Sequence, residues 1–146
     1  MTDFRPILLV EDDPNDAELT LEALAEYHLI NEVVTVRDGA QALDLFYGRG
    51  QYRQRTPCIP AVVLLDLHLP KIDGLEVLHS LRADPRLMTV PVIILTGSRA
   101  VSDFVESNRM GVSAYLEKPL NFFRLSEAIL KLGLRWAVFD SQPTSR

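Results

Sequence analysis

Short runs of consecutive apolar residues alternate along the chain with longer stretches in which apolar residues recur every three or four positions. Continuous apolar runs are typical of strands that are buried on both faces, and the wider recurrence is typical of amphipathic helices. The runs predict five strands, at Ile7–Val10, Glu32–Val36, Ala61–Leu65, Val92–Leu95 and Ala114–Glu117.

A helix is predicted after each strand. Asp13 has a side chain suited to an N-cap, and Pro14 suits the first helical position. The helix that they begin should reach about Tyr27 and bury one face, made of Ala17, Leu21, Leu24 and Ala25. The other helices are predicted from Gly39 to about Tyr47 with Leu43 and Phe46 inward, from Gly74 to about Ala83, near Ser102 to Met110, and from the cap Asn121 to about Leu132.

Five strand–helix units in sequence predict an α/β fold with a parallel sheet and helices on both faces. The leading candidate is the flavodoxin-like, doubly wound order 2-1-3-4-5. We expect residues 6–133 to form one domain. Residues 134–146 are expected to be a C-terminal extension, with an apolar arm followed by a polar tail.

Polar residues follow four of the five predicted strands. They are Glu11, Asp12 and Asp13 after the first strand, Asp66 after the third, Thr96 after the fourth and Lys118 after the fifth. Because parallel strands bring their carboxyl ends to the same edge of a sheet, these residues should meet there, where open α/β sheets bind ligands.

The residue types predict a phosphoryl site that contains a metal ion. Three close carboxylates, from Glu11, Asp12 and Asp66, would repel one another without a cation, and Mg²⁺ is the natural hard cation for such oxygens. Lys118 and Thr96 can then bind phosphoryl oxygens through an ammonium and a hydroxyl. We expect Asp66 to be the acceptor because it is the one acid that follows its strand.

Composition narrows the class of function. The 146 residues carry 15 Lys and Arg against 20 Asp and Glu, a formal charge of −5, so a general affinity for nucleic acid or an anionic membrane is not expected. The single cysteine excludes an internal disulfide framework and a cysteine cluster for zinc. With no apolar signal segment or membrane-length run, the expected location is the cytoplasm.

Four motifs together resemble the receiver domain of two-component response regulators, the CheY-like fold. The resemblance covers about Ile7 to Leu132. The motifs are Ile7-Leu8-Leu9-Val10-Glu11-Asp12-Asp13-Pro14, Leu64-Leu65-Asp66-Leu67-His68-Leu69-Pro70 with Asp73-Gly74, Ile94-Leu95-Thr96-Gly97, and Tyr115-Leu116-Glu117-Lys118-Pro119.

The resemblance implies that a sensor histidine kinase transfers a phosphoryl group to Asp66. Asp12 would then be a direct metal ligand and Glu11 would act mainly through water. The backbone carbonyl of His68 would complete the metal site.

The resemblance also assigns the switch residues. Thr96 and Lys118 would bind the phosphoryl group and relay its presence. Tyr115 would be the aromatic switch, and the bond before Pro119 would be cis, a form open to X-Pro bonds at modest cost.

Two segments are similar to single-domain regulators that accompany bacterial phytochromes, the red-light sensor kinases: the long connection Gly48–Pro60 and the apolar tail Leu132–Phe139. This subgroup implies a phytochrome as the kinase and a homodimer, made either by the arm or by the face of the fourth helix, fifth strand and last helix. Since the sequence leaves no room for an output domain, we expect output through an unidentified partner protein.

Two other classes of function remain open. A magnesium-dependent phosphohydrolase with Asp66 as nucleophile, similar to the haloacid dehalogenase group, would need a second acid where the chain has His68. A nucleotide- or flavin-binding module would need a glycine- or hydroxyl-rich loop after the first strand, where the chain has Glu11-Asp12-Asp13-Pro14.

Overall fold

The computed structural model describes residues 5–26, 31–54, 59–69, 71–97, 111–118 and 122–132. Five parallel strands form one sheet in the order β2-β1-β3-β4-β5, which confirms the predicted topology. The strands are β1 (Ile7–Val10), β2 (Val33–Val36), β3 (Val62–Asp66), β4 (Val92–Thr96) and β5 (Ala114–Glu117). β3 and β4 each end one residue later than predicted, because Asp66 and Thr96 still pair with the neighbouring strand.

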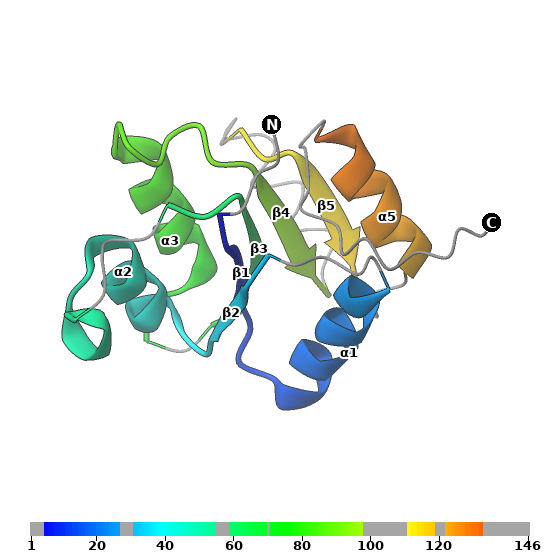
Figure 1. Cartoon of the computed structure of the whole chain (residues 1–146), viewed down its shortest axis with the longest axis horizontal. Coiled ribbons are helices and arrows are strands. Elements are labelled where there is room, and N and C mark those ends of the chain that lie inside the picture. Colours follow the sequence, from blue (N-terminus) through cyan, green and yellow to red (C-terminus); the bar gives the residue numbers. More distant parts are fainter. Residues whose placement is uncertain are drawn as a thin grey trace.

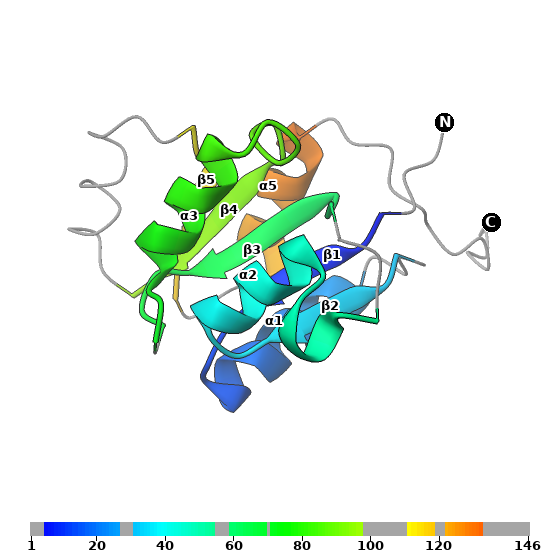
Figure 2. The ribbon, with the colours of Figure 1, turned by 90° about the vertical axis from the view of Figure 1, so that its left-hand side faces the viewer.

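Helices cover both faces of the sheet. They are α1 (Pro14–Ala25), α2 (Gly39–Tyr47), α3 (Gly74–Ala83) and α5 (Phe122–Lys131), and a 3-10 turn, η1 (Gly50–Tyr52), follows α2. α2 and α3 lie on one face, and α1 and α5 lie on the other (Figures 1 and 2). The helix expected near Ser102–Met110 and the cap Asn121 lie outside the described residues.

The core consists of two layers because successive strand side chains point to opposite faces. Leu8 and Val10 of β1 pack with the buried residues of α2 and α3. Ile7 and Leu9 pack instead with those of α1 and α5. Both layers are apolar, so the buried polar side chains that the strands carry lie at the strand ends.

The start of α1 confirms the prediction, and its buried face agrees with the prediction in part. The Asp13 side chain accepts hydrogen bonds from the backbone N–H groups of the second and third helical residues, with Pro14 at the first position. The helix buries Thr20 and Leu24, whereas Leu21 is 38% exposed and Ala25 is exposed. Ala17 packs against the same core layer as Leu24, so two of the four predicted residues face inward, and Thr20 is buried in place of Leu21.

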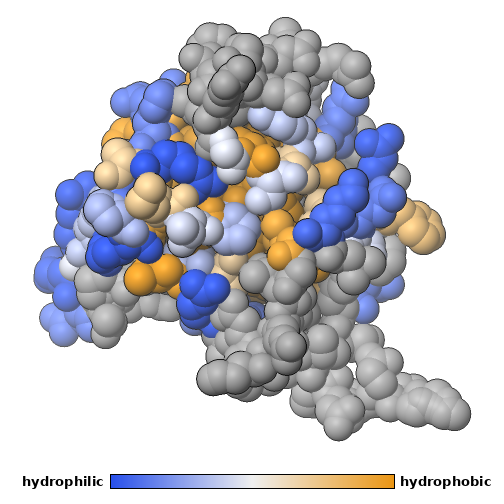
Figure 3. Space-filling model, turned by 90° about the horizontal axis from the view of Figure 1, so that it is seen from above, coloured by the Kyte–Doolittle hydropathy of each residue, from blue (hydrophilic) through white to orange (hydrophobic). Residues whose placement is uncertain are grey.

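Hydrophobic and hydrophilic side chains are interspersed on the described surface in the view from above (Figure 3). The exposed large apolar residues lie on separate elements, and scattered exposure of this kind is normal for a folded domain. They are Leu19, Leu21, Met88 and Phe123. Among the described residues, no helix has the length and apolar character needed to cross a bilayer.

Candidate functional site

Four strands bring polar residues to the same edge of the sheet. Glu11 and Asp12 follow β1, Asp66 and Thr96 end β3 and β4, and Lys118 follows β5. The arrowheads of β4 and β5 point in the same direction in Figure 1. The backbone N–H of Lys118 donates to the Thr96 carbonyl at 2.8 Å, which fixes the lysine beside the end of β4.

The Lys118 ammonium lies among three carboxylates. Its Nζ is 2.8 Å from Glu11 Oε1, 2.9 Å from Asp16 Oδ2 and 3.0 Å from Asp66 Oδ2. The Glu11 and Asp66 side chains are almost fully buried, while those of Lys118 and Asp16 are 20% and 34% exposed. The single ammonium thus neutralises part of the negative charge of a cluster that is only partly accessible to water.

Both oxygens of the Asp66 carboxylate have fixed partners. Oδ2 accepts a hydrogen bond from Lys118, and Oδ1 accepts one from the backbone N–H of His68 at 2.9 Å. His68 is itself exposed. These two bonds orient the carboxylate without using the His68 ring.

Glu11, Asp12 and Asp66 also form a group that could hold a metal ion, since one oxygen from each lies within 4.8 Å of the others. Glu11 Oε1 is buried and accepts no hydrogen bond of good geometry, although the Lys118 ammonium lies 2.8 Å away. Carboxylate oxygens are the hard donors that Mg²⁺ prefers. The residues therefore fit the divalent cation expected from the sequence.

Burial and charge shift the pKa values of two groups at this edge. The pKa of Glu11 is raised from 4.5 to about 7, chiefly because burial disfavours the carboxylate and also because Asp66 is close, while Lys118 acts in the opposite direction. Burial lowers the pKa of Lys118, but its contacts with Glu11, Asp16 and Asp66 outweigh that effect and raise it above the usual range. Lys118 is therefore a permanent positive charge.

The remaining predicted residues have different surroundings. Thr96 is buried at the end of β4, with only 2% of its surface exposed. Tyr115 is half-buried in β5, pairs with Ile94 of β4 and packs against the core layer of α2 and α3. Pro119 lies outside the described residues.

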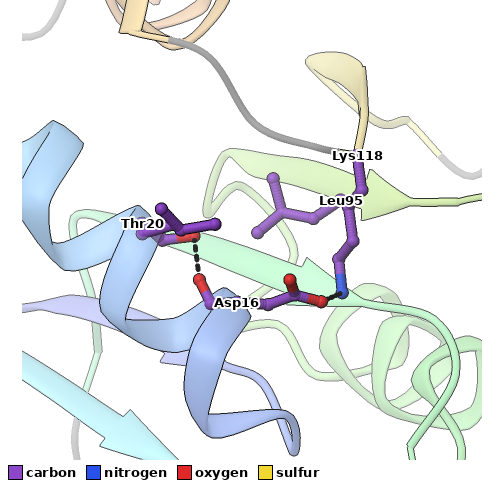
Figure 4. Close-up of a pocket in the computed structure, with 5 residues that line it drawn as sticks. Asp16, Thr20, Leu95 and Lys118 are labelled. Atoms are coloured by element: carbon purple, nitrogen blue, oxygen red, sulfur yellow. Dashed lines mark hydrogen bonds and ion pairs between the residues drawn. The ribbon is translucent and has the colours of Figure 1, made fainter.

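Asp16 is a member of the cluster that the sequence analysis missed. It is the third residue of α1, and its carboxylate points toward the end of β5, where it meets Lys118 (Figure 4). A spacing of four residues places Asp16 in one helical row with Thr20 and Leu24, both of which are buried. That row could have indicated an inward-facing carboxylate.

The 2-1-3-4-5 parallel sheet and the contact between Asp66 at the end of β3 and Lys118 after β5 define the class of protein, a response-regulator receiver domain. The chain belongs to this family: the family model described as "Response regulator receiver domain" matches residues 7–130. Its members are signalling proteins whose function is to accept a phosphoryl group.

Several response regulators are similar to this chain over most of its length, and two of them are named for bacteriophytochromes. The chain is 36% identical to response regulator Rcp1 of Synechocystis sp., over 89% of this chain and 87% of that protein. The structure of the bacteriophytochrome response regulator RtBRR shares 51% identity with a TM-score of 0.89, covering 97% of this chain and 86% of that one. For the bacteriophytochrome response regulator AtBRR the identity is 50% and the TM-score 0.86, covering 95% and 99%.

A crystal structure of the Mn²⁺-bound form of Rcp1 is also similar. It shares 35% identity and a TM-score of 0.74, covering 89% of this chain and 94% of that one. These likenesses confirm the receiver fold, which the four motifs indicated, and the relation to phytochrome-associated regulators, which the two longer segments indicated.

Proposed function

We propose that Asp66 is the phosphoryl acceptor of this receiver. Lys118, Thr96 and the neighbouring acids would assist the transfer. The observation that carries the proposal is the 3.0 Å contact between Lys118 Nζ and Asp66 Oδ2. An aspartate fixed at the end of a central strand, beside a permanent cation and two further acids, can attack phosphorus and have the incoming charge neutralised.

The transfer step is a displacement at phosphorus. One Asp66 oxygen forms a bond to the phosphorus of a phosphohistidine on the kinase, the bond from phosphorus to the imidazole nitrogen breaks, and the leaving imidazole gains a proton from solvent. The product is an acyl phosphate on Asp66. The Lys118 ammonium binds one phosphoryl oxygen, and the Thr96 hydroxyl binds another after it moves toward the group.

Glu11, Asp12 and Asp66 would hold the divalent cation, with Asp12 as a direct ligand, Glu11 mainly through water, and the His68 carbonyl completing the set. The bound cation would neutralise phosphoryl charge during transfer. The exposed position of Asp12, and the burial of Glu11 against the Lys118 ammonium, support this division of roles. We take Mg²⁺ as the cation because these ligands are hard oxygen donors.

A small phosphodonor tests the acceptor assignment. With acetyl phosphate and Mg²⁺, the intact mass of the wild type should increase by one phosphoryl group that hydroxylamine removes, and Asp66→Asn should show no increase. Asp44→Asn is the matched control, because Asp44 lies on α2 and pairs with Arg49. A hydroxylamine-sensitive adduct on Asp66→Asn at wild-type stoichiometry would show that the acceptor is another residue.

We further propose that the phosphodonor is a red-light sensor histidine kinase. The names of RtBRR and AtBRR, both bacteriophytochrome response regulators, support this assignment, since each is half identical to this chain over most of its length. Phosphotransfer profiling against the sensor kinases of the source organism tests it. Faster transfer from a kinase without a phytochrome sensor would overturn it.

The proposed unit of signalling is a homodimer of a receiver domain at residues 6–133 with an extension at residues 134–146. The proposed location is the cytoplasm, and output passes to a partner protein that the sequence does not identify. Residues 133–146, which include the arm, lie outside the described residues.

A further inference from the structure

Among the described residues, Asp16 contacts the proposed phosphoryl site through Lys118. Its Oδ2 accepts a hydrogen bond from Lys118 Nζ at 2.9 Å, across 102 positions of sequence. Figure 4 shows the Lys118 side chain extending from the end of β5 to the first turn of α1 to make this bond. Asp16 is not one of the three acids grouped around the possible metal position.

The backbone around Asp16 is fixed. Its N–H donates to the Asp13 side chain at 3.2 Å, and its carbonyl accepts from the hydroxyl of Thr20, a buried residue, at 3.0 Å. The acid is therefore held in place at the start of α1 rather than drawn there by Lys118.

The two charges are in direct contact, and there is little room for water beside them. A cavity of about 10 Å³ adjoins the pair, and it is lined by Asp16, Leu19, Thr20, Leu95 and Lys118. A volume of this size holds about one water molecule. Because the two side chains are only 20% and 34% exposed, the interaction is screened less than one between fully exposed side chains.

The role of Asp16 follows from what happens to the other two partners of Lys118. In the proposed phosphorylated state Glu11 faces the cation, and Asp66 carries the phosphoryl group. Asp16 then remains as the one partner of the three that keeps a free carboxylate beside the ammonium. Its charge offsets part of the lysine's charge, and its oxygen occupies one of the three ammonium donors.

We propose that Asp16 is a positioning residue that tunes the phosphoryl site through Lys118. The inference rests on the proposed function. The Asp16 charge weakens the attraction of the site for a phosphoryl group, and so favours its release, and it strengthens the attraction of the site for the cation. Removal of the charge should move the two affinities in opposite directions.

This opposite response separates the electrostatic role from structural damage, which would weaken both. Asp16→Asn keeps a hydrogen-bond acceptor for Lys118 and removes only the charge. In saturating Mg²⁺, we expect beryllofluoride, a phosphoryl mimic, to bind Asp16→Asn about fivefold more tightly than the wild type, from a charge acting over a few ångströms at a partly exposed site. Mg²⁺ alone should bind the variant about twofold to threefold more weakly.

Fluorine NMR can measure beryllofluoride binding, and calorimetry can measure Mg²⁺ binding. The matched control is Glu18→Gln, which makes the same charge change on an exposed side chain of the same helix. We expect Glu18→Gln to leave both affinities unchanged. Asp16→Glu, which restores the charge, should return both affinities toward the wild-type values.

The measurements distinguish a failure of this inference from a failure of the proposed function. Equal or weaker beryllofluoride binding by Asp16→Asn would overturn the inference, as would an equal shift in Glu18→Gln. If the wild type binds no beryllofluoride in Mg²⁺, or if Asp66→Asn binds it as well as the wild type does, the proposed function fails and the inference fails with it.

Discussion

Gly74 lies so close to the end of β3 that a Cβ atom there would come within 2.6 Å of the Asp66 carbonyl oxygen. The same Cβ would lie 2.6 Å from Leu67 Cα, and the Gly74 N–H donates to the Leu67 carbonyl at 3.1 Å. The first turn of α3 therefore packs directly on the backbone that carries the proposed acceptor. Any side chain at position 74 must displace that backbone.

Gly74→Ala should destabilise the domain and impair phosphorylation together. We expect the free energy of unfolding to fall by about 2 kcal/mol, the usual size for a forced backbone shift in a packed region. Urea unfolding and the acetyl phosphate assay measure the two effects. Gly97→Ala is the control, because a Cβ at Gly97 meets no atom within 4 Å. Equal stability of the two variants would show that the close approach is not a constraint.

The raised pKa of Glu11 predicts a pH dependence of stability in the metal-free protein. With a folded-state pKa of about 7 and an ordinary value of 4.5, the folded state binds more protons than the unfolded state between these pH values. The contribution of Glu11 to stability is therefore present below pH 4.5 and is lost as pH rises through 7. The largest loss would be about 3 kcal/mol, from 1.36 kcal/mol per pKa unit.

Urea unfolding in EDTA at several pH values tests this dependence. Glu11→Gln should remove most of the decline between pH 5 and 7. Addition of Mg²⁺ should restore stability to the wild type at neutral pH, because a bound cation competes with the proton for the carboxylate. If the free energy of unfolding depends on pH in the same way in the wild type and in Glu11→Gln, another group is responsible for the pH dependence.

The fold could be predicted because a doubly wound sheet requires a characteristic pattern of apolar residues along the sequence. The strands are buried on both faces and so read as continuous apolar runs. Their exact ends were harder to predict. Asp66 and Thr96 are polar, but each still pairs with the adjacent strand and is nearly fully buried, so hydropathy alone ended both strands one residue early.

The site was predictable where its residues follow strands, and Asp16 was missed because it does not. Topology alone brought Glu11, Asp66 and Lys118 together, whereas the position of Asp16 depends on the rotation of α1 about its axis. The same rotation explains why Leu21 is exposed where the apolar pattern expected it inside. The rotation of a helix is set by its packing against the sheet and by its cap. A weakly amphipathic sequence such as that of α1 does not specify this rotation.

The proposed homodimer predicts a change of mass on truncation. Removal of residues 134–146 should give a monomer that still accepts a phosphoryl group on Asp66, because the described sheet and its acidic edge are built without that segment. Light scattering at tens of micromolar, roughly the range of weak specific association, distinguishes the two states. A full-length monomer would reject the dimer. A truncated chain that stays dimeric would place the interface elsewhere, which we expect to be the face that includes β5 and α5.

The last prediction concerns the proposed coupling of Thr96 to Tyr115. The two residues lie on adjacent strands, and Thr96 is buried while Tyr115 is half-buried. When the Thr96 hydroxyl moves toward a phosphoryl group, it leaves space beside β4 that the Tyr115 ring can fill by turning inward. Such a shift requires two states of similar free energy, whose balance the phosphoryl group changes.

Thr96→Ala should accept a phosphoryl group from acetyl phosphate but leave the Tyr115 ring in its unphosphorylated environment, because no hydroxyl moves. Thr96→Ser keeps the hydroxyl and should retain the response. NMR of ring-labelled tyrosine, with Tyr115→Phe to assign the signal, compares each protein before and after phosphorylation. If phosphorylation shifts the Tyr115 signal equally in the wild type and Thr96→Ala, the switch does not operate through the Thr96 hydroxyl.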